Sequence, residues 1–132
     1  MGEPSRREPA FQDESEAYSL FQRGLAFLRT QHAAQAAMLL ERALRLEPGR
    51  NSIREALGRA EFALDMHEHA AARFRDVLAD APDNDYAQYA LGRCLIAVGR
   101  PDEARAHLRL ARALRPQSEL YGEALRALDQ SA

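Results

Sequence analysis

Apolar residues recur every three or four positions along most of the chain, and polar residues fill the positions between them. This is the spacing of a helix that buries one face. No segment alternates apolar and polar residues with a period of two, so we expect no strand. Proline, glycine and small polar clusters divide the pattern into seven segments. The predicted helices cover residues 15–30, 33–47, 51–64, 67–80, 85–98, 101–114 and 118–130.

Residue types also repeat at a fixed interval of 34 positions, which is the length of a helix–turn–helix repeat. Gly24, Gly58 and Gly92 define the interval. Four further registers follow it: Ala36, Ala70 and Ala104; Leu40, Phe74 and Leu108; Ala43, Val77 and Ala111; Pro48, Pro82 and Pro116. Glycine and alanine let two helices approach closely, and proline ends the second helix. With these five registers, residues 17–118 resemble the tetratricopeptide repeat family.

The resemblance implies an all-α, right-handed solenoid of three helix–turn–helix repeats, at residues 17–50, 51–84 and 85–118. A single hairpin cannot bury its apolar face, so the three would stack and share one core. Residues 118–130 are amphipathic but too short for another repeat, and we expect them to form a capping helix. Together these elements would make one domain over residues 14–132.

In this family the first helix of each repeat lines a concave face, so the resemblance implies a groove for a protein or peptide. The groove positions carried over from the first repeat are Tyr18, Phe21, Gln22, Leu25 and Arg29. Those from the second are Ser52, Glu55, Ala56, Arg59, Phe62 and Ala63. Those from the third are Tyr86, Tyr89, Ala90, Arg93, Ile96 and Ala97. The family's clamp for acidic chaperone tails uses Lys, Asn and Arg, but the corresponding residues here are Phe21, Leu25, Ala56, Tyr86 and Ala90, so that function is not supported.

Arg59 and Arg93 occupy equivalent registers one repeat apart, on helices that the resemblance makes neighbours. Two guanidinium groups could hold an acidic side chain, a C-terminal carboxylate or a phosphate. An alternative is that Arg59 pairs with Glu55 at i,i+4 and Arg93 is only solvated. Equally, Tyr86 and Tyr89 could do no more than cover the capping helix.

Residues 1–13 contain Gly2, Pro4, Pro9 and several charges, which predicts a disordered tail. Asp13 or Ser15 can then cap the first helix. The tail also carries Phe11 among Glu8, Asp13 and Glu14. A second hypothesis is therefore that the tail lies in the groove of its own or a neighbouring molecule, near Arg59 and Arg93, and competes with the partner.

Composition narrows the function classes. The chain has 132 residues, 46% hydrophobic and 29% charged, with a net charge of −2, so nothing draws it generally to nucleic acid or anionic lipid. Arg105, Arg109 and Arg112 form a basic stripe, which we interpret as a solvated outer face. No apolar run approaches the roughly 18 residues that span a bilayer, and no apolar signal-peptide core precedes the first helix. We expect a cytoplasmic protein that binds neither membrane nor nucleic acid.

Catalytic motifs are missing from the sequence. There is no phosphate-binding glycine loop and no nucleophile elbow, and all 18 basic residues are Arg, which excludes Schiff-base chemistry. His67 and His69 point to different sides of a helix, so they cannot share a metal ion. Cys94, the one cysteine, lies beside Gly92 and is interpreted as a small buried hydrophobe. We expect a non-enzymatic adaptor or scaffold with no cofactor and no metal. The alternatives are a self-associating module and, less favoured, a regulator linked to nucleic acid.

Overall fold

The computed structural model describes residues 8–12 and 15–131, and within them it contains seven helices and no strand. The helices are α1 (Glu16–Arg29), α2 (Ala33–Leu46), α3 (Asn51–Ala63), α4 (His67–Asp80), α5 (Asp85–Ala97), α6 (Pro101–Leu114) and α7 (Glu119–Gln130). Every boundary lies within one residue of the prediction. The predicted all-α fold is therefore confirmed.

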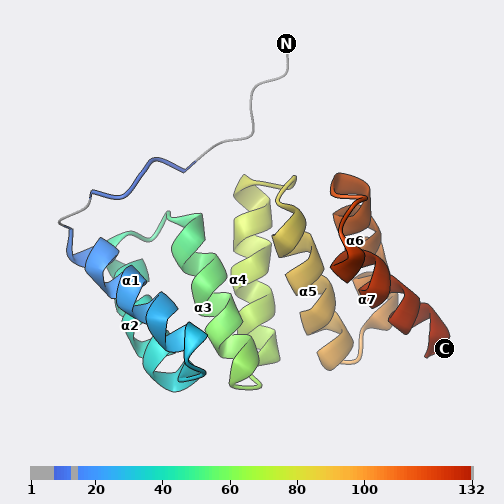
Figure 1. The fold of residues 1–132 in the computed structure, drawn as a ribbon, viewed down its shortest axis with the longest axis horizontal. Coiled ribbons are helices and arrows are strands. Elements are labelled where there is room, and N and C mark those ends of the chain that lie inside the picture. Colours follow the sequence, from blue (N-terminus) through green and yellow to red (C-terminus); the bar gives the residue numbers. More distant parts are fainter. Residues whose placement is uncertain (1–7, 13–14, 132) are drawn as a thin grey trace, which may run out of the picture.

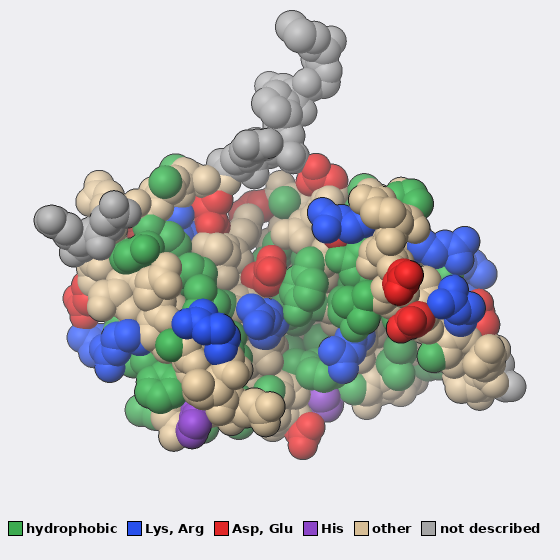
Figure 2. Space-filling view, viewed as in Figure 1, with side chains coloured by type: hydrophobic (Ala, Val, Ile, Leu, Met, Phe, Trp, Pro, Cys, Tyr) green, Lys and Arg blue, Asp and Glu red, His purple; other side chains and the backbone are tan. Residues whose placement is uncertain are grey.

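The helices form three hairpins, α1–α2, α3–α4 and α5–α6, followed by α7, and the hairpins stack side by side (Figure 1). The first helices of the hairpins and α7 make one layer, while α2, α4 and α6 make the other. We call the α1–α3–α5–α7 side the groove face. It is the side turned towards the viewer in Figures 1 and 2.

The repeated glycines hold the two helices of each hairpin close together. A Cβ atom at Gly24 would lie 2.7 Å from Cγ of Leu40, and one at Gly58 would lie 2.8 Å from Cζ of Phe74. Distances below 3.0 Å leave no room for a side chain. The predicted packing role is confirmed, and the residue that fills the space differs between hairpins.

The turns inside the hairpins also repeat every 34 residues. Gln31, Asp65 and Gly99 all adopt a left-handed backbone, with φ of 63°, 60° and 80°. Only the third is a glycine, so the other two keep this turn at some conformational cost. The same turn therefore recurs in all three hairpins, although only one of the three residues is a glycine.

Helix starts on the groove face depend on side-chain caps. Ser15, Asn84 and Ser118 accept a hydrogen bond from the third backbone N–H of α1, α5 and α7, over 3.0, 3.0 and 3.3 Å. Of the two cap residues predicted for α1, Ser15 makes the bond; Asp13 lies outside the described residues. The corresponding residue of α3 is Arg50, which cannot accept such a bond from the helix.

Two reactive or ionisable side chains, Cys94 and Glu61, lie in the interior. Cys94 is completely buried, and burial raises the pKa of its thiol to about 11, which confirms it as a small buried side chain.

Glu61 is 1% exposed, and its carboxylate accepts two hydrogen bonds from Arg73 of α4, at 3.0 and 3.4 Å. This ion pair ties the two helices of the second hairpin together.

Candidate functional site

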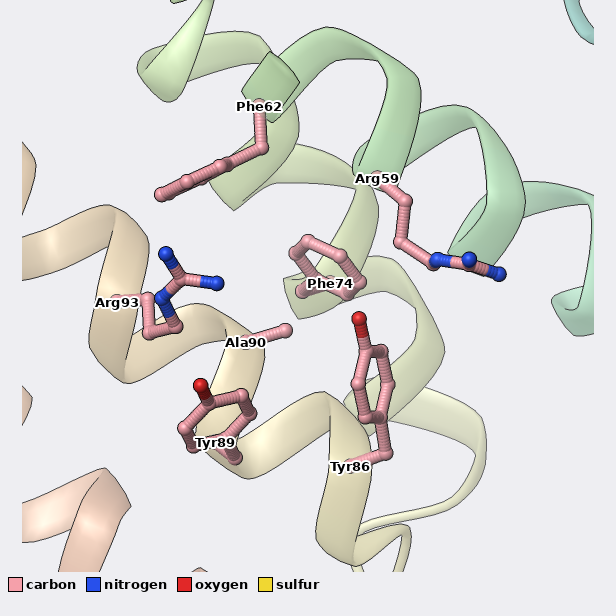
Figure 3. Close-up of a pocket in the computed structure, with 7 residues that line it drawn as sticks. All are labelled: Arg59, Phe62, Phe74, Tyr86, Tyr89, Ala90 and Arg93. Atoms are coloured by element: carbon pink, nitrogen blue, oxygen red, sulfur yellow. The ribbon is translucent and has the colours of Figure 1, made fainter. Parts of the chain in front are cut away.

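A pocket of about 190 Å³ opens on the groove face between α3 and α5 (Figure 3). Residues of α3 form one wall of the pocket, and residues of α5 form the opposite wall. One aromatic ring of α4 forms its floor. The lining residues are Arg59, Phe62, Phe74, Tyr86, Tyr89, Ala90 and Arg93. We call this the arginine–aromatic pocket. Figure 2 shows hydrophobic side chains gathered over the middle of this face with arginines around them.

Arg93 is oriented by two aromatic rings. Its guanidinium carbon lies 4.6 Å from the centre of the Phe62 ring and 5.8 Å from that of Tyr89. Both distances are within the range of a cation–π contact. In Figure 3 the guanidinium points towards Phe62, and the Arg93 side chain is exposed. Arg93 is thus held in place while its donors stay available.

Arg59 and Arg93 are exposed, and neither takes part in an ion pair among residues 8–12 and 15–131. No ion pair among the described residues therefore supports the alternative in which Glu55 neutralises Arg59. Burial raises the pKa of the Glu55 carboxyl, although the Asn84 side chain and the charge of Arg59 act against that rise. The mouth of the pocket consequently carries two cationic groups.

The tyrosines have different environments. Tyr89 is buried, and its ring centre lies 5.1 Å from that of Tyr121 on α7, so it does cover the capping helix. Tyr86 is half-buried and lies edge-on to Phe74, with ring centres 6.3 Å apart. Burial raises the pKa of the Tyr86 hydroxyl, and that hydroxyl points towards the Arg59 side of the pocket in Figure 3. Tyr86 therefore faces the pocket, and Tyr89 serves both the pocket and the cap.

The other expected groove residues are spread along the face. Leu25 packs against the core of the first two hairpins, while Gln22 and Arg29 are exposed on α1, away from the pocket. Tyr18 and Phe21 contact Phe11 of the N-terminal segment. Of the seventeen groove positions expected from the sequence, the pocket brings together Arg59, Phe62, Tyr86, Tyr89, Ala90 and Arg93.

Sequence reasoning missed Phe74 as a pocket residue because its register was assigned to packing within the hairpin. That register holds Leu40 and Leu108 in the other repeats. The ring of Phe74 is long enough both to contact Gly58 and to form the floor of the pocket. The signal that could have identified Phe74 is an aromatic residue at a position where the other two repeats have leucine.

A second groove of about 520 Å³ continues from the pocket between α5 and α7. It shares Tyr89 and Arg93 with the pocket, so the two are contiguous. The rest of its lining is Ile96, Leu120, Glu123, Ala124, Ala127, Leu128 and Ser131. Ile96 and Leu120 are 41% and 50% exposed, which makes this end of the groove face apolar.

The described part of the chain has neither a cluster of metal-ligand side chains nor a membrane-spanning helix. No three His, Cys, Asp or Glu side chains lie close enough together to hold a metal ion. No helix there has the length and apolar character to cross a membrane.

The hairpin stack, its packing glycines and its lined groove define a helical repeat protein. The tetratricopeptide repeat family model matches residues 62–128, just over half of the chain, and the chain belongs to this family. Its repeats are protein-interaction modules. No curated protein matches the sequence.

Solved structures agree on the fold. The first tetratricopeptide repeat domain of Spaghetti (RPAP3), bound to the HSP90 peptide SRMEEVD, is 17% identical with a TM-score of 0.83, over 88% of this chain and 92% of that one. The first such domain of human RPAP3 is 17% identical with a TM-score of 0.81, over 87% and 91%. The domain of Arabidopsis OM64 is 19% identical with a TM-score of 0.83, over 88% and 96%.

Proposed function

We propose that this protein is a non-enzymatic adaptor or assembly scaffold that binds a segment of another protein along its groove face. The observation that carries the proposal is the arginine–aromatic pocket, which is lined by aromatic rings and by Arg59 and Arg93, and neither arginine has an ion-pair partner among the described residues. Guanidinium groups bind carboxylate and phosphate groups well. The partner segment therefore carries an acidic group.

The size of the pocket supports a peptide rather than a small metabolite. At about 190 Å³ it is smaller than the roughly 300–1,000 Å³ of most small-molecule sites. One side chain or a chain terminus fills such a space. The contiguous groove between α5 and α7 has exposed Ile96 and Leu120, so apolar residues next to the acidic group would lie there.

The relatives support the class of ligand but not its chemistry. One solved neighbour holds an HSP90 peptide that ends in acidic residues. In this chain the positions expected for the chaperone clamp carry no Lys and no Asn, as noted above. We therefore propose an acidic segment recognised through arginine and aromatic side chains.

Matched peptide pairs test this proposal. Each pair of random-sequence fluorescent peptide pools differs only in the acidic group: a C-terminal carboxylate or its amide, and an internal Glu or Gln. We expect one acidic pool to bind at least tenfold more tightly than its neutral match, because a lost bidentate contact costs about 1.4 kcal/mol or more. Equal binding within every pair would exclude acidic recognition by this face.

A self-associating module is the second candidate, and the exposed apolar end of the groove favours it. Ile96 and Leu120 could pack against a second copy. Solution mass measured across a range of protein concentrations distinguishes this function from binding of another protein. We expect Leu120→Glu to abolish any dimer, whereas a monomer at all concentrations would rule out self-association.

A further inference from the structure

Residues 8–12 lie against the repeats at the edge where α1 and α3 begin (Figure 1). The Phe11 ring stacks on Phe21, with ring centres 5.1 Å apart, and meets Tyr18 edge-on at 5.5 Å. The guanidinium carbon of Arg50 lies 3.8 Å from the centre of the same ring. Phe11 is thus held between two aromatic rings of α1 and a cation at the start of α3.

Glu8 supplies the cap that α3 lacks. The backbone N–H of Ser52 donates to both carboxylate oxygens of Glu8, at 3.0 and 3.2 Å. The same register holds Asn84 and Ser118 in the next repeat and the cap, and each of those side chains caps its own helix. Arg50 replaces them here, so the start of α3 is open to a carboxylate from elsewhere.

Arg50 also binds the segment between these two residues. It donates to the carbonyl oxygen of Pro9, and its guanidinium lies 3.8 Å from the Glu8 carboxylate. Glu47 fixes Arg50 from the other side through a hydrogen bond of 3.1 Å. The Arg50 side chain is only 10% exposed beneath the segment. One preoriented arginine therefore contacts a carboxylate, a backbone carbonyl and an aromatic ring of the same short segment.

These contacts differ from the sequence-based hypothesis, which placed the tail near Arg59 and Arg93. Residues 8–12 bind at Arg50 instead, because the uncapped start of α3 lies beside the aromatic side chains of α1. Residues 1–7 and 13 of the predicted disordered tail lie outside the described residues, as does Glu14.

We propose that Tyr18, Phe21, Arg50 and the backbone N–H of Ser52 form a second recognition site, here called the Glu–Phe site. Its ligand is a peptide segment of a partner with a glutamate three residues before a phenylalanine. Residues 8–12 of this chain carry that spacing and occupy the site in cis, so they compete with the partner. The site shares no residue with the arginine–aromatic pocket, so it can be tested separately.

The factor by which the tethered segment weakens binding of a partner peptide can be predicted. A short flexible tether gives an effective concentration of about 1 mM. If the free segment binds with a Kd near 0.1 mM, the bound tail weakens binding in trans about tenfold. Tighter intrinsic binding would give a larger difference.

Peptide binding to the full chain tests the proposal. The probe is a fluorescent peptide with the sequence of residues 5–14, and the measurement is its anisotropy during titration. We expect the Glu8→Ala/Phe11→Ala chain to bind it at least tenfold more tightly than the wild-type chain. The Gln12→Ala chain is the matched control, because Gln12 is exposed and its side chain makes no hydrogen bond among the described residues, and it should behave as wild type. A peptide with alanine in place of its phenylalanine should lose binding.

Hydrogen exchange checks the contact inside the chain. We expect the Ser52 amide to exchange at least tenfold faster in the Glu8→Ala chain than in wild type. The Ala87 amide, capped by Asn84, should not change and serves as the internal reference. An unchanged Ser52 rate, or equal peptide affinity for the wild-type and doubly substituted chains, would overturn the proposal.

Discussion

At the scale of single residues, the structure separates side chains that hold the fold from those that are free to bind. Glu61 and Arg93 occupy helices of the groove layer, but Glu61 is fully paired with Arg73 in the interior. Arg93 lies over Phe62 with its donors exposed. Charge alone does not distinguish these two roles, because burial and partners decide them.

The Glu61–Arg73 pair predicts an asymmetric response to mutation. Arg73→Met leaves a buried carboxylate without its partner and should destabilise the protein by about 3–5 kcal/mol. Glu61→Met leaves a guanidinium that is 29% exposed and can reach water, so it should cost clearly less. Urea denaturation of both variants measures the difference. Equal losses would show that the pair is not buried as described.

Single residues also show which part of the arginine–aromatic pocket the sequence could predict and which part it could not. Arg59, Phe62, Tyr86 and Arg93 follow from the repeat register, because that register fixes which helix face they lie on. The floor made by Phe74 depends on how far one ring extends past Gly58. No spacing rule encodes that distance.

At the scale of elements, each hairpin depends on a close approach at its glycine. Gly92→Leu would force a side chain into Leu108, whose Cδ2 and Cγ atoms already lie 2.9 Å from a Cβ built there. We expect a loss of roughly 1–3 kcal/mol or more. Gly49→Leu is the matched control, since no atom lies within 4 Å of its Cβ position, and it should stay within about 0.5 kcal/mol. Two equal melting temperatures would refute the packing role.

The third hairpin contains a contact between its helices that should depend on pH. Nδ1 of His107 on α6 lies 2.7 Å from Oε1 of Gln88 on α5, and Gln88 donates through Nε2 to the carbonyl oxygen of Pro82. Since Oε1 can only accept, Nδ1 is the donor. Burial lowers the pKa of His107, and the charge of Arg75 lowers it further.

A lowered pKa means that the folded chain binds this proton more weakly than the unfolded chain does. The stability that His107 contributes is therefore present above its unfolded pKa of about 6.5 and is lost as the pH falls through the lower folded value. We expect the stability difference between wild type and His107→Gln to shrink between about pH 7.5 and pH 5. Denaturant titrations at both pH values measure it, and a constant difference would contradict this.

At the scale of the whole molecule, the helices and their stacking could be predicted from the 34-residue registers, because equivalent residues make equivalent packing contacts in all three hairpins. The binding of residues 8–12 did not follow in the same way. Polar composition predicts a disordered tail, yet Glu8 and Phe11 match the missing cap of α3 and the aromatic pair on α1. The bond between Glu8 and Ser52 joins residues 44 positions apart, which is beyond the reach of local sequence patterns.

The most direct test of the account is capture of partners from the native cell by immobilised wild-type and variant chains. We expect Arg59→Ala/Arg93→Ala to recover at least tenfold less of the wild-type partner, with a stability loss within about 1 kcal/mol. The control, Arg109→Ala/Arg112→Ala, removes two exposed arginines of α6 and the same charge, and it should capture as wild type. Undiminished capture by the folded groove variant, or an equal loss in both variants, would contradict binding through the arginine–aromatic pocket.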